Sequence, residues 1–205
     1  KSKNNTNKMQ RPTKEQIRGL PLYSGISLVD IKIIENEQDA IEALKQLKHE
    51  TCLGFDTESK PIFRKGEVSP GPTLIQLSTS SKAFLFPTKF PAALAAANKI
   101  LANPDIKKVG FGLKGDNKEL RSKLNIEILN TIDLSVKLKN LVGDKNRIGA
   151  QAAVAMVLKA RLAKGAQMSN WGAYPLNKNQ ILYAANDAHC AICIEQSLAS
   201  LTTES

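Results

Sequence analysis

The order of apolar and polar positions along the chain predicts alternating strands and helices. Residues 26–34 partly alternate and are rich in β-branched side chains, which is typical of a strand, whereas residues 37–48 carry apolar side chains at helical spacing. Three short apolar runs separated by turn-rich segments follow, at residues 52–57, 73–78 and 82–86. Three strands in such close succession indicate an antiparallel meander.

Helices and strands alternate in the chain that follows the meander. The pattern predicts an Ala-rich helix at 92–101, a strand at 108–111, a helix from Asp116 and a strand at 128–134. The last third is mainly helical, and its longest helix is expected at 179–198, with Asn177 as a plausible cap. We therefore expect an α/β fold in which a mixed sheet, an antiparallel meander plus parallel strands, is flanked by helices.

Composition fits one domain with a polyanionic partner. The chain has 205 residues, 42% of them hydrophobic, which is enough for one substantial core. Its 29 Lys and Arg against 19 Asp and Glu give a formal charge of +10, which favours nucleic acid or an anionic membrane surface. No apolar run approaches the roughly 18 residues of a spanning helix. We expect residues 1–15 to be a disordered tail and residues 16–205 to form a single domain.

Cysteine usage indicates a reducing compartment. Cys52, Cys190 and Cys193 are an odd and sparse set that forms no disulfide framework. The N-terminus also carries no apolar signal-peptide core, which favours an intracellular, cytoplasmic protein. Although Cys190 and Cys193 form a CxxC, they occupy a helical segment without a second pair or a histidine at zinc-finger spacing, so we interpret them as core residues.

The first candidate for chemistry is a pair of carboxylates at the end of an apolar strand. Asp56 and Glu58 are separated by one residue, and positions i and i+2 of a strand share a face. Two adjacent carboxylates repel each other unless a cation lies between them. The alternative is a solvated strand end, and the pair taken alone does not exclude it.

Two further acidic positions have ordinary structural explanations when each is taken alone. Asp116 follows a Gly-rich strand end and begins a predicted helix, where Asp is usually a cap. Tyr183 and Asp187 lie one turn apart on one face of the longest helix, and Ala184, Ala185 and Ala188 beside them allow that helix to pack closely on a sheet. The alternative for this pair is a hydrogen bond at the rim of the core.

In this order, these motifs resemble the tyrosine branch of the exonuclease superfamily that is named for its four carboxylates. Other strings resemble ribonuclease D and Werner-type exonuclease domains, over residues 26–198 in total. These strings are Leu74-Ile75-Gln76-Leu77, Ser169-Asn170-Trp171, Pro175-Leu176, Gln180, and Tyr183-Ala184-Ala185-Asn186-Asp187-Ala188. The resemblance implies a ribonuclease H-like fold and a 3′–5′ exonuclease.

The resemblance also implies two divalent cations held by Asp56, Glu58, Asp116 and Asp187. Four converging acids need bound cations, and hard oxygen ligands suit Mg²⁺ or Mn²⁺ rather than zinc. By resemblance, Asp56 bridges both ions, Glu58 and Asp187 complete the site of the attacking water, and Asp116 supports the second ion through water. Because an unperturbed tyrosine has a pKa near 10, the expected task of Tyr183 is to aim the water rather than to act as a base.

Candidate substrate-binding residues are Thr57, Gln76, Asn170 and Trp171, although Trp171 could equally be a core anchor. Six basic residues near the first two motifs could hold phosphates, although each alone could be a surface charge. They are Lys60, Arg64, Lys65, Lys114, Lys118 and Arg121.

The expected activity is therefore hydrolysis of phosphodiester bonds from the 3′ end of DNA, RNA or both, which releases nucleoside 5′-monophosphates. One alternative is ribonuclease D-like processing of RNA 3′ ends, and another is a module that binds 3′ ends without cleaving them. Ser59 stands where Werner-type domains carry Trp, and the C-terminal helical domains of ribonuclease D have no counterpart in the sequence, which favours a stand-alone nuclease core. Sugar preference and oligomeric state stay open.

Overall fold

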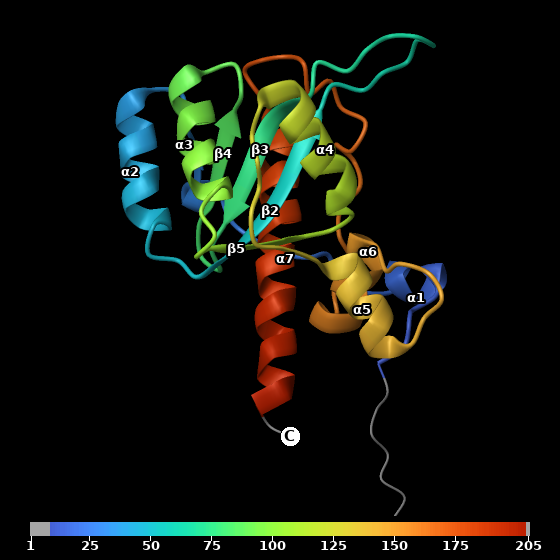
Figure 1. The fold of residues 1–205 in the computed structure, drawn as a ribbon. Helices are drawn as coiled ribbons and strands as arrows, with labels where there is room; N and C mark the ends of the chain where they lie inside the picture. The colour runs from blue at the N-terminus through green and yellow to red at the C-terminus, as the bar shows by residue number, and fades with distance from the viewer. Residues whose placement is uncertain (1–8, 204–205) are drawn as a thin grey trace, which may run out of the picture.

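The structure, a computed structural model, describes residues 9–203 and contains one mixed sheet (Figure 1). Within this range the sheet has six strands in the order β1-β4-β3-β2-β5-β6. Their bounds are β1 Ile31–Ile33, β2 Cys52–Ser59, β3 Pro72–Ser78, β4 Ala83–Pro87, β5 Lys107–Gly110 and β6 Thr131–Asp133. β2, β3 and β4 are the antiparallel meander, and β1, β5 and β6 join in parallel, which confirms the expected mixed sheet.

Strand alternation divides the core between the two faces of the sheet. Leu53, Phe55 and Ile75 point to the face covered by α2 (Glu37–Leu47), α3 (Pro91–Leu101) and α4 (Leu113–Leu124). Leu74 and Leu85 point to the opposite face, where they pack with alanines of α7 (Lys178–Thr203). Figure 1 shows α7 running behind the sheet while α2, α3 and α4 lie in front of it.

The helix α7 begins with a reciprocal cap. The side chain of Asn177 accepts a hydrogen bond from the backbone N–H of Gln180 at 2.9 Å, and the Gln180 side chain accepts one from the backbone N–H of Asn177 at 3.0 Å. This is a capping box, which satisfies two N–H groups at the helix start. Asn177 is therefore the cap expected from the sequence, and the helix extends five residues beyond the expected end at 198.

Two elements begin at residues other than those expected. In place of a strand at 26–34 the chain forms a short 3₁₀ helix, η1 (Leu28–Asp30), before the three-residue β1. The helix α4 begins at Leu113 rather than at Asp116, because Gly112 adopts a left-handed conformation with φ 64° that turns the chain directly out of β5. Asp116 thus lies inside the first turn and is not the cap.

The chain between β6 and α7 packs beside the sheet. It forms α5 (Leu134–Val142), α6 (Ala150–Ala153) and the π-helical turn η2 (Val154–Leu158), which share a core cluster with α7. In the range 9–203 no helix combines the length and the apolar character that crossing a membrane would require.

The N-terminal segment takes part in the structure from residue 9. Residues 1–8 of the expected tail lie outside the described residues, whereas Met9 packs on the cluster of α5, α6 and α7. The helix α1 (Lys14–Arg18) is capped by Thr13, whose side chain accepts from the N–H of Gln16 at 3.1 Å. The expected domain start at residue 16 therefore falls within a helix.

The loop between β2 and β3, residues 60–71, projects from the body of the molecule (Figure 1). Lys60 pairs with Glu67 at 3.8 Å within this loop. Near its end, Gly71 lies against the side chain of Lys123 on α4.

Close packing of α7 on β2 depends on Gly54. A Cβ atom at this position would overlap the backbone carbonyl of Ala188 and contact the N–H of Ile192 at 3.1 Å. Backbone atoms of a helix cannot rotate away as a side chain can, so only glycine permits this approach.

We expect Gly54→Ala to destabilise the protein by about 1–3 kcal/mol, since the added methyl group must separate α7 from β2. Guanidinium unfolding followed by circular dichroism measures the change. Gly115→Ala on α4 is the matched control: its Cβ meets no atom within 4 Å, so it should stabilise the helix by about 0.5–1 kcal/mol. Equal stability of the two variants would contradict the role of Gly54.

Candidate active site

Asp56 and Glu58 lie on the part of β2 that extends beyond its neighbour β5. The parallel pairing of β2 with β5 ends at Gly54 opposite Val109, and β5 itself ends at Gly110. On the other side, β2 stays paired with β3 through Asp56 and Glu58. The two carboxylates are thus held by one strand partner and open on the other side.

The helix α7 brings Asp187 to these two carboxylates. Three alanines of this helix are fully buried against the sheet: Ala184, Ala185 and Ala188. Their packing fixes the rotation of the helix about its axis and so the direction of the Asp187 side chain. One carboxylate oxygen from each of Asp56, Glu58 and Asp187 lies within 4.8 Å of the others. The two distant motifs predicted to converge do so.

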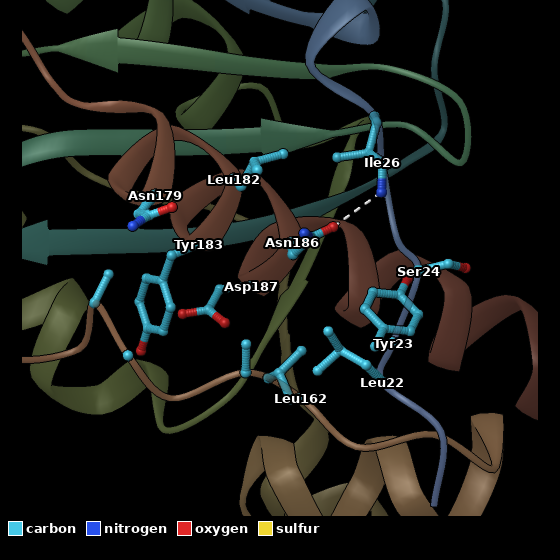
Figure 2. Close-up of a pocket in the computed structure, with 13 residues that line it drawn as sticks. Leu22, Tyr23, Ser24, Ile26, Leu162, Asn179, Leu182, Tyr183, Asn186 and Asp187 are labelled. Atoms are coloured by element: carbon cyan, nitrogen blue, oxygen red, sulfur yellow. Dashed lines mark hydrogen bonds between the residues drawn. The ribbon is translucent and has the colours of Figure 1, made fainter.

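Tyr183 lies one turn before Asp187, and Figure 2 shows its ring beside the Asp187 carboxylate. The phenol is half-buried and its hydrogen bond to Asp187 favours the charged carboxylate. Burial, with the nearby charges of Asp187, Glu58 and Asp56, raises the pKa of Tyr183 well above its ordinary value. The hydroxyl therefore keeps its proton at neutral pH and can act as a donor but not as a base.

Asp116 reaches the site from the other face of the sheet. Because side chains alternate along β2, Thr57 points towards α4, and its hydroxyl donates a short hydrogen bond to the Asp116 carboxylate. Asp116 is not among the three residues whose oxygens cluster. Its charge nonetheless raises the pKa of Asp56 and of Glu58. The fourth predicted acid therefore interacts electrostatically with the cluster.

Asp133 positions the start of α4, a role that the sequence motifs did not indicate. Its carboxylate accepts hydrogen bonds from the backbone N–H groups of Gly112 at 3.0 Å and Leu113 at 3.1 Å. It also caps α5 by accepting from the N–H of Ser135 at 3.0 Å. An Asp at the junction of a strand and a helix could have indicated the cap of α5. The hydrogen bonds to Gly112 and Leu113 could not be predicted from local pattern, because these residues lie about 20 positions away in the sequence.

The acidic cluster favours protonated carboxyl groups when no cation is bound. Burial, and then the charge of Asp187, raise the pKa of Asp56 well above its ordinary value. Burial, with the charges of Asp187 and Asp116, raises the pKa of Glu58 to about 8. Burial raises the pKa of Asp187 to about 7, against the hydrogen bonds from Tyr183 and Asp56 that lower it. Bound divalent cations would remove this repulsion, and the all-oxygen set of three carboxylates suits them.

A groove of about 790 Å³ opens onto the cluster. Asp56, Glu58 and Asp187 are the acidic residues that line it, and Thr57 and Tyr183 line it as well. The six basic residues expected to hold phosphates lie outside this groove, and two of them form ion pairs elsewhere: Lys60 with Glu67 at 3.8 Å and Arg121 with Glu127 at 2.7 Å.

The four candidate substrate-binding residues occupy different environments. Thr57 lines the groove. Gln76 is fully buried beneath α7, with its amide 3.4 Å from the carbonyl oxygen of Ala184. Trp171 is 2% exposed and its ring lies 6.0 Å from that of Tyr183, so it packs next to the tyrosine in the core. Asn170 is exposed and accepts from the N–H of Gly172 at 3.2 Å, outside the groove.

A second cavity of about 450 Å³ lies beside Tyr183 and Asp187, between α7 and the chain around residues 22–26 (Figure 2). The side chain of Asn186 lines this cavity and accepts a hydrogen bond from the N–H of Ile26 at 2.9 Å. Asn186 stands within the helical motif, and its contact fastens the N-terminal segment to the helix that carries Asp187.

Comparison with known proteins gives a consistent result. A family model described as 3′–5′ exonuclease matches residues 31–202. The mouse bifunctional 3′–5′ exonuclease/ATP-dependent helicase WRN is 33% identical over 156 residues, which cover 73% of this chain and 11% of the mouse protein. The human exonuclease mut-7 homolog is 30% identical over 172 residues, covering 71% of this chain and 20% of the human protein. The chain thus spans a fifth or less of these two relatives.

Among solved structures, the EXO domain of Aedes aegypti Nibbler matches with a TM-score of 0.76 at 22% identity, covering 87% of this chain and 91% of that one. This similarity establishes the fold, which is the expected ribonuclease H-like arrangement.

We expect the metal-free protein to lose stability as pH rises, and Glu58→Gln to reduce that loss. A carboxyl group whose folded pKa is raised stabilises the fold below its unfolded pKa, and this contribution disappears as pH rises through the folded value. For Glu58 the window runs from about 4.5 to about 8. In EDTA at pH 8, Glu58→Gln should melt roughly 2–4 °C or more above the unchanged protein, with a smaller difference at pH 5.

Thermal melts with and without Mg²⁺ check this expectation, with Glu42→Gln on the exposed face of α2 as the control. Mg²⁺ should raise the melting temperature of the unchanged protein at pH 8 more than that of Glu58→Gln. If the melting temperatures of the unchanged protein and of Glu58→Gln followed parallel curves against pH, Glu58 would not be the titrating group.

Proposed function

The chain belongs to the 3′–5′ exonuclease family, and we propose that it removes nucleotides one at a time from the 3′ end of DNA or RNA. This family, whose tyrosine branch the sequence motifs resemble, consists of hydrolases of phosphodiester bonds that use divalent metal ions. One observation carries the proposal for this chain: Asp56, Glu58 and Asp187 converge at the floor of an open groove, with Tyr183 beside them.

The cations proposed for this site are two Mg²⁺ or Mn²⁺ ions, which would polarise the attacking water and stabilise the leaving oxygen. Asp56, Glu58 and Asp187 hold them from the floor of the groove, and Asp116 supports the site from the face of α4 through Thr57. The pKa values of Glu58, about 8, and Asp187, about 7, imply that these carboxyl groups release protons when cations bind.

Tyr183 positions the water in this proposal. Its raised pKa keeps the phenol protonated and its single proton is donated to Asp187, so the hydroxyl oxygen accepts a hydrogen bond from the water without removing the proton. Packing against Trp171 and the hydrogen bond to Asp187 limit the orientations of the ring.

The experiment that tests the function uses matched single-stranded and duplex DNA and RNA, labelled at either end, with Mg²⁺, Mn²⁺ or EDTA. We expect stepwise shortening from the 3′ end, release of nucleoside 5′-monophosphates and no reaction in EDTA. Asp56→Asn and Asp187→Asn should each lower the rate roughly 100-fold or more, because each removes a negative charge from the acidic cluster that holds the cations. Asp105→Asn, in an exposed turn, is the matched control and should keep full activity.

Three outcomes separate the alternatives. Cleavage that persists in both cluster variants would overturn the site. Tight binding of 3′ ends without cleavage by the intact protein would indicate a binding module. Cleavage confined to RNA would identify the ribonuclease D-like alternative, in which the 2′-hydroxyl is recognised.

We expect Tyr183→Phe to lower kcat about 10- to 100-fold while metal affinity stays within a few-fold, since the change removes one hydrogen bond to a charged site and no ligand. Single-turnover cleavage measures the rate, and calorimetric titration with Mn²⁺ measures affinity. A collapse of metal affinity would instead make Tyr183 a structural support of Asp187.

A further inference from the structure

One wall of the groove is built from the N-terminal segment, which lies outside the region matched by the family model. Arg11, Pro12, Lys14 and Ile17 line the groove that holds the three clustered carboxylates, whereas the family match begins at residue 31. The family model therefore does not describe this wall.

The segment is fastened to the body at several points. The guanidinium group of Arg11 donates to the Asp144 carboxylate at 2.8 Å and to the carbonyl oxygens of Asn146 at 3.0 Å and Arg147 at 2.7 Å. Thr13 and Gln16 form a capping box at the start of α1. Arg11 is thus occupied as an anchor, and its charge is balanced by Asp144.

Beyond α1, the chain is hydrogen-bonded to a loop that also lines the groove. The backbone N–H of Arg161 donates to the carbonyl of Pro21, and the N–H of Tyr23 donates to the carbonyl of Arg161, both at 2.8 Å. Leu162, Ala163 and Lys164 follow directly and line the groove. These bonds fix the segment and the loop relative to each other.

Lys14 and Lys164 are the uncompensated charges of this part of the groove. Both are exposed and both line it. Among residues 9–203, neither ammonium group forms an ion pair with a carboxylate, in contrast to Arg11. The acidic residues that line the groove are the three clustered carboxylates, Asp56, Glu58 and Asp187. The groove therefore combines three clustered carboxylates with two unpaired lysines.

We propose that Lys14 and Lys164 bind the phosphates of the substrate strand upstream of the bond that is cut, so that the N-terminal segment acts as a clamp on the incoming strand. The inference rests on the proposed function, because it places the terminal phosphodiester at the carboxylate cluster. The rest of the strand must then leave along the groove, where unpaired lysines attract its phosphates without reading its sequence.

The test compares Lys14→Gln, Lys164→Gln and the double variant with Lys99→Gln, which removes the same charge from the exposed side of α3. Binding of an eight-nucleotide single strand with a 3′-terminal phosphorothioate linkage is followed by fluorescence anisotropy at several salt concentrations. We expect each groove variant to weaken binding roughly 3- to 10-fold at low salt and to reduce the slope of log affinity against log salt by about 0.7. Lys99→Gln should change neither.

Substrate length separates a phosphate clamp from an effect on folding or on the metals. A dinucleotide has no phosphate upstream of the bond that is cut, so its kcat/KM should stay the same in the groove variants, whereas kcat/KM for the eight-nucleotide strand should fall. Equal loss for both lengths, or binding equal to that of Lys99→Gln, would overturn the clamp. If the intact protein binds strands without cutting them, the proposed function fails while the anisotropy series still decides the role of the two lysines.

Discussion

The contact between α7 and β2 at Gly54 is the constraint on which the rest of the site depends. Helix and strand approach until the backbone of Ala188 occupies the space where a side chain of residue 54 would be. Asp56 lies two residues beyond this contact on the strand, and Asp187 lies one residue before it on the helix. Close backbone packing therefore fixes the positions from which the two carboxylates extend.

Alternation along β2 distributes the acidic groups around the strand. Asp56 and Glu58 point to the side of α7, whereas Thr57 between them points to α4 and receives Asp116 by a hydrogen bond. Asp133 fixes the first residues of α4 and so the position of Asp116. Repulsion is concentrated in three carboxyl groups whose pKa values are all raised, and the charge of Asp116 further raises the pKa of Asp56 and of Glu58 from across the strand. An arrangement that is unfavourable without cations is in this way kept in place by the fold.

Local pattern predicted the parts of the fold that depend on local sequence. The meander strands, the helix cap at Asn177 and the convergence of Asp56 with Asp187 follow from periodicity, turn residues and motif order. Features fixed by distant contacts could not be predicted. The early start of α4 depends on Asp133, which binds the N–H groups of the left-handed Gly112 and of Leu113, and the burial of Gln76 depends on the position of α7. The polar composition of the N-terminal segment indicated a tail, because the partners that anchor Arg11 lie more than 130 residues away.

The long β2–β3 loop has a consequence for how the sequence of this fold can diverge. The chain leaves the sheet after Ser59 and re-enters it at Pro72, and these two residues are paired with each other. The register of the carboxylate-bearing strand therefore does not depend on the loop between Ser59 and Pro72. The entropy of closing a flexible loop grows slowly, by about 0.6 kcal/mol for each doubling of its length. Insertions and deletions between residues 60 and 71 are therefore among the changes that the fold tolerates best. Descendants of this chain could acquire new contacts at that point while inheriting an unaltered carboxylate-bearing strand.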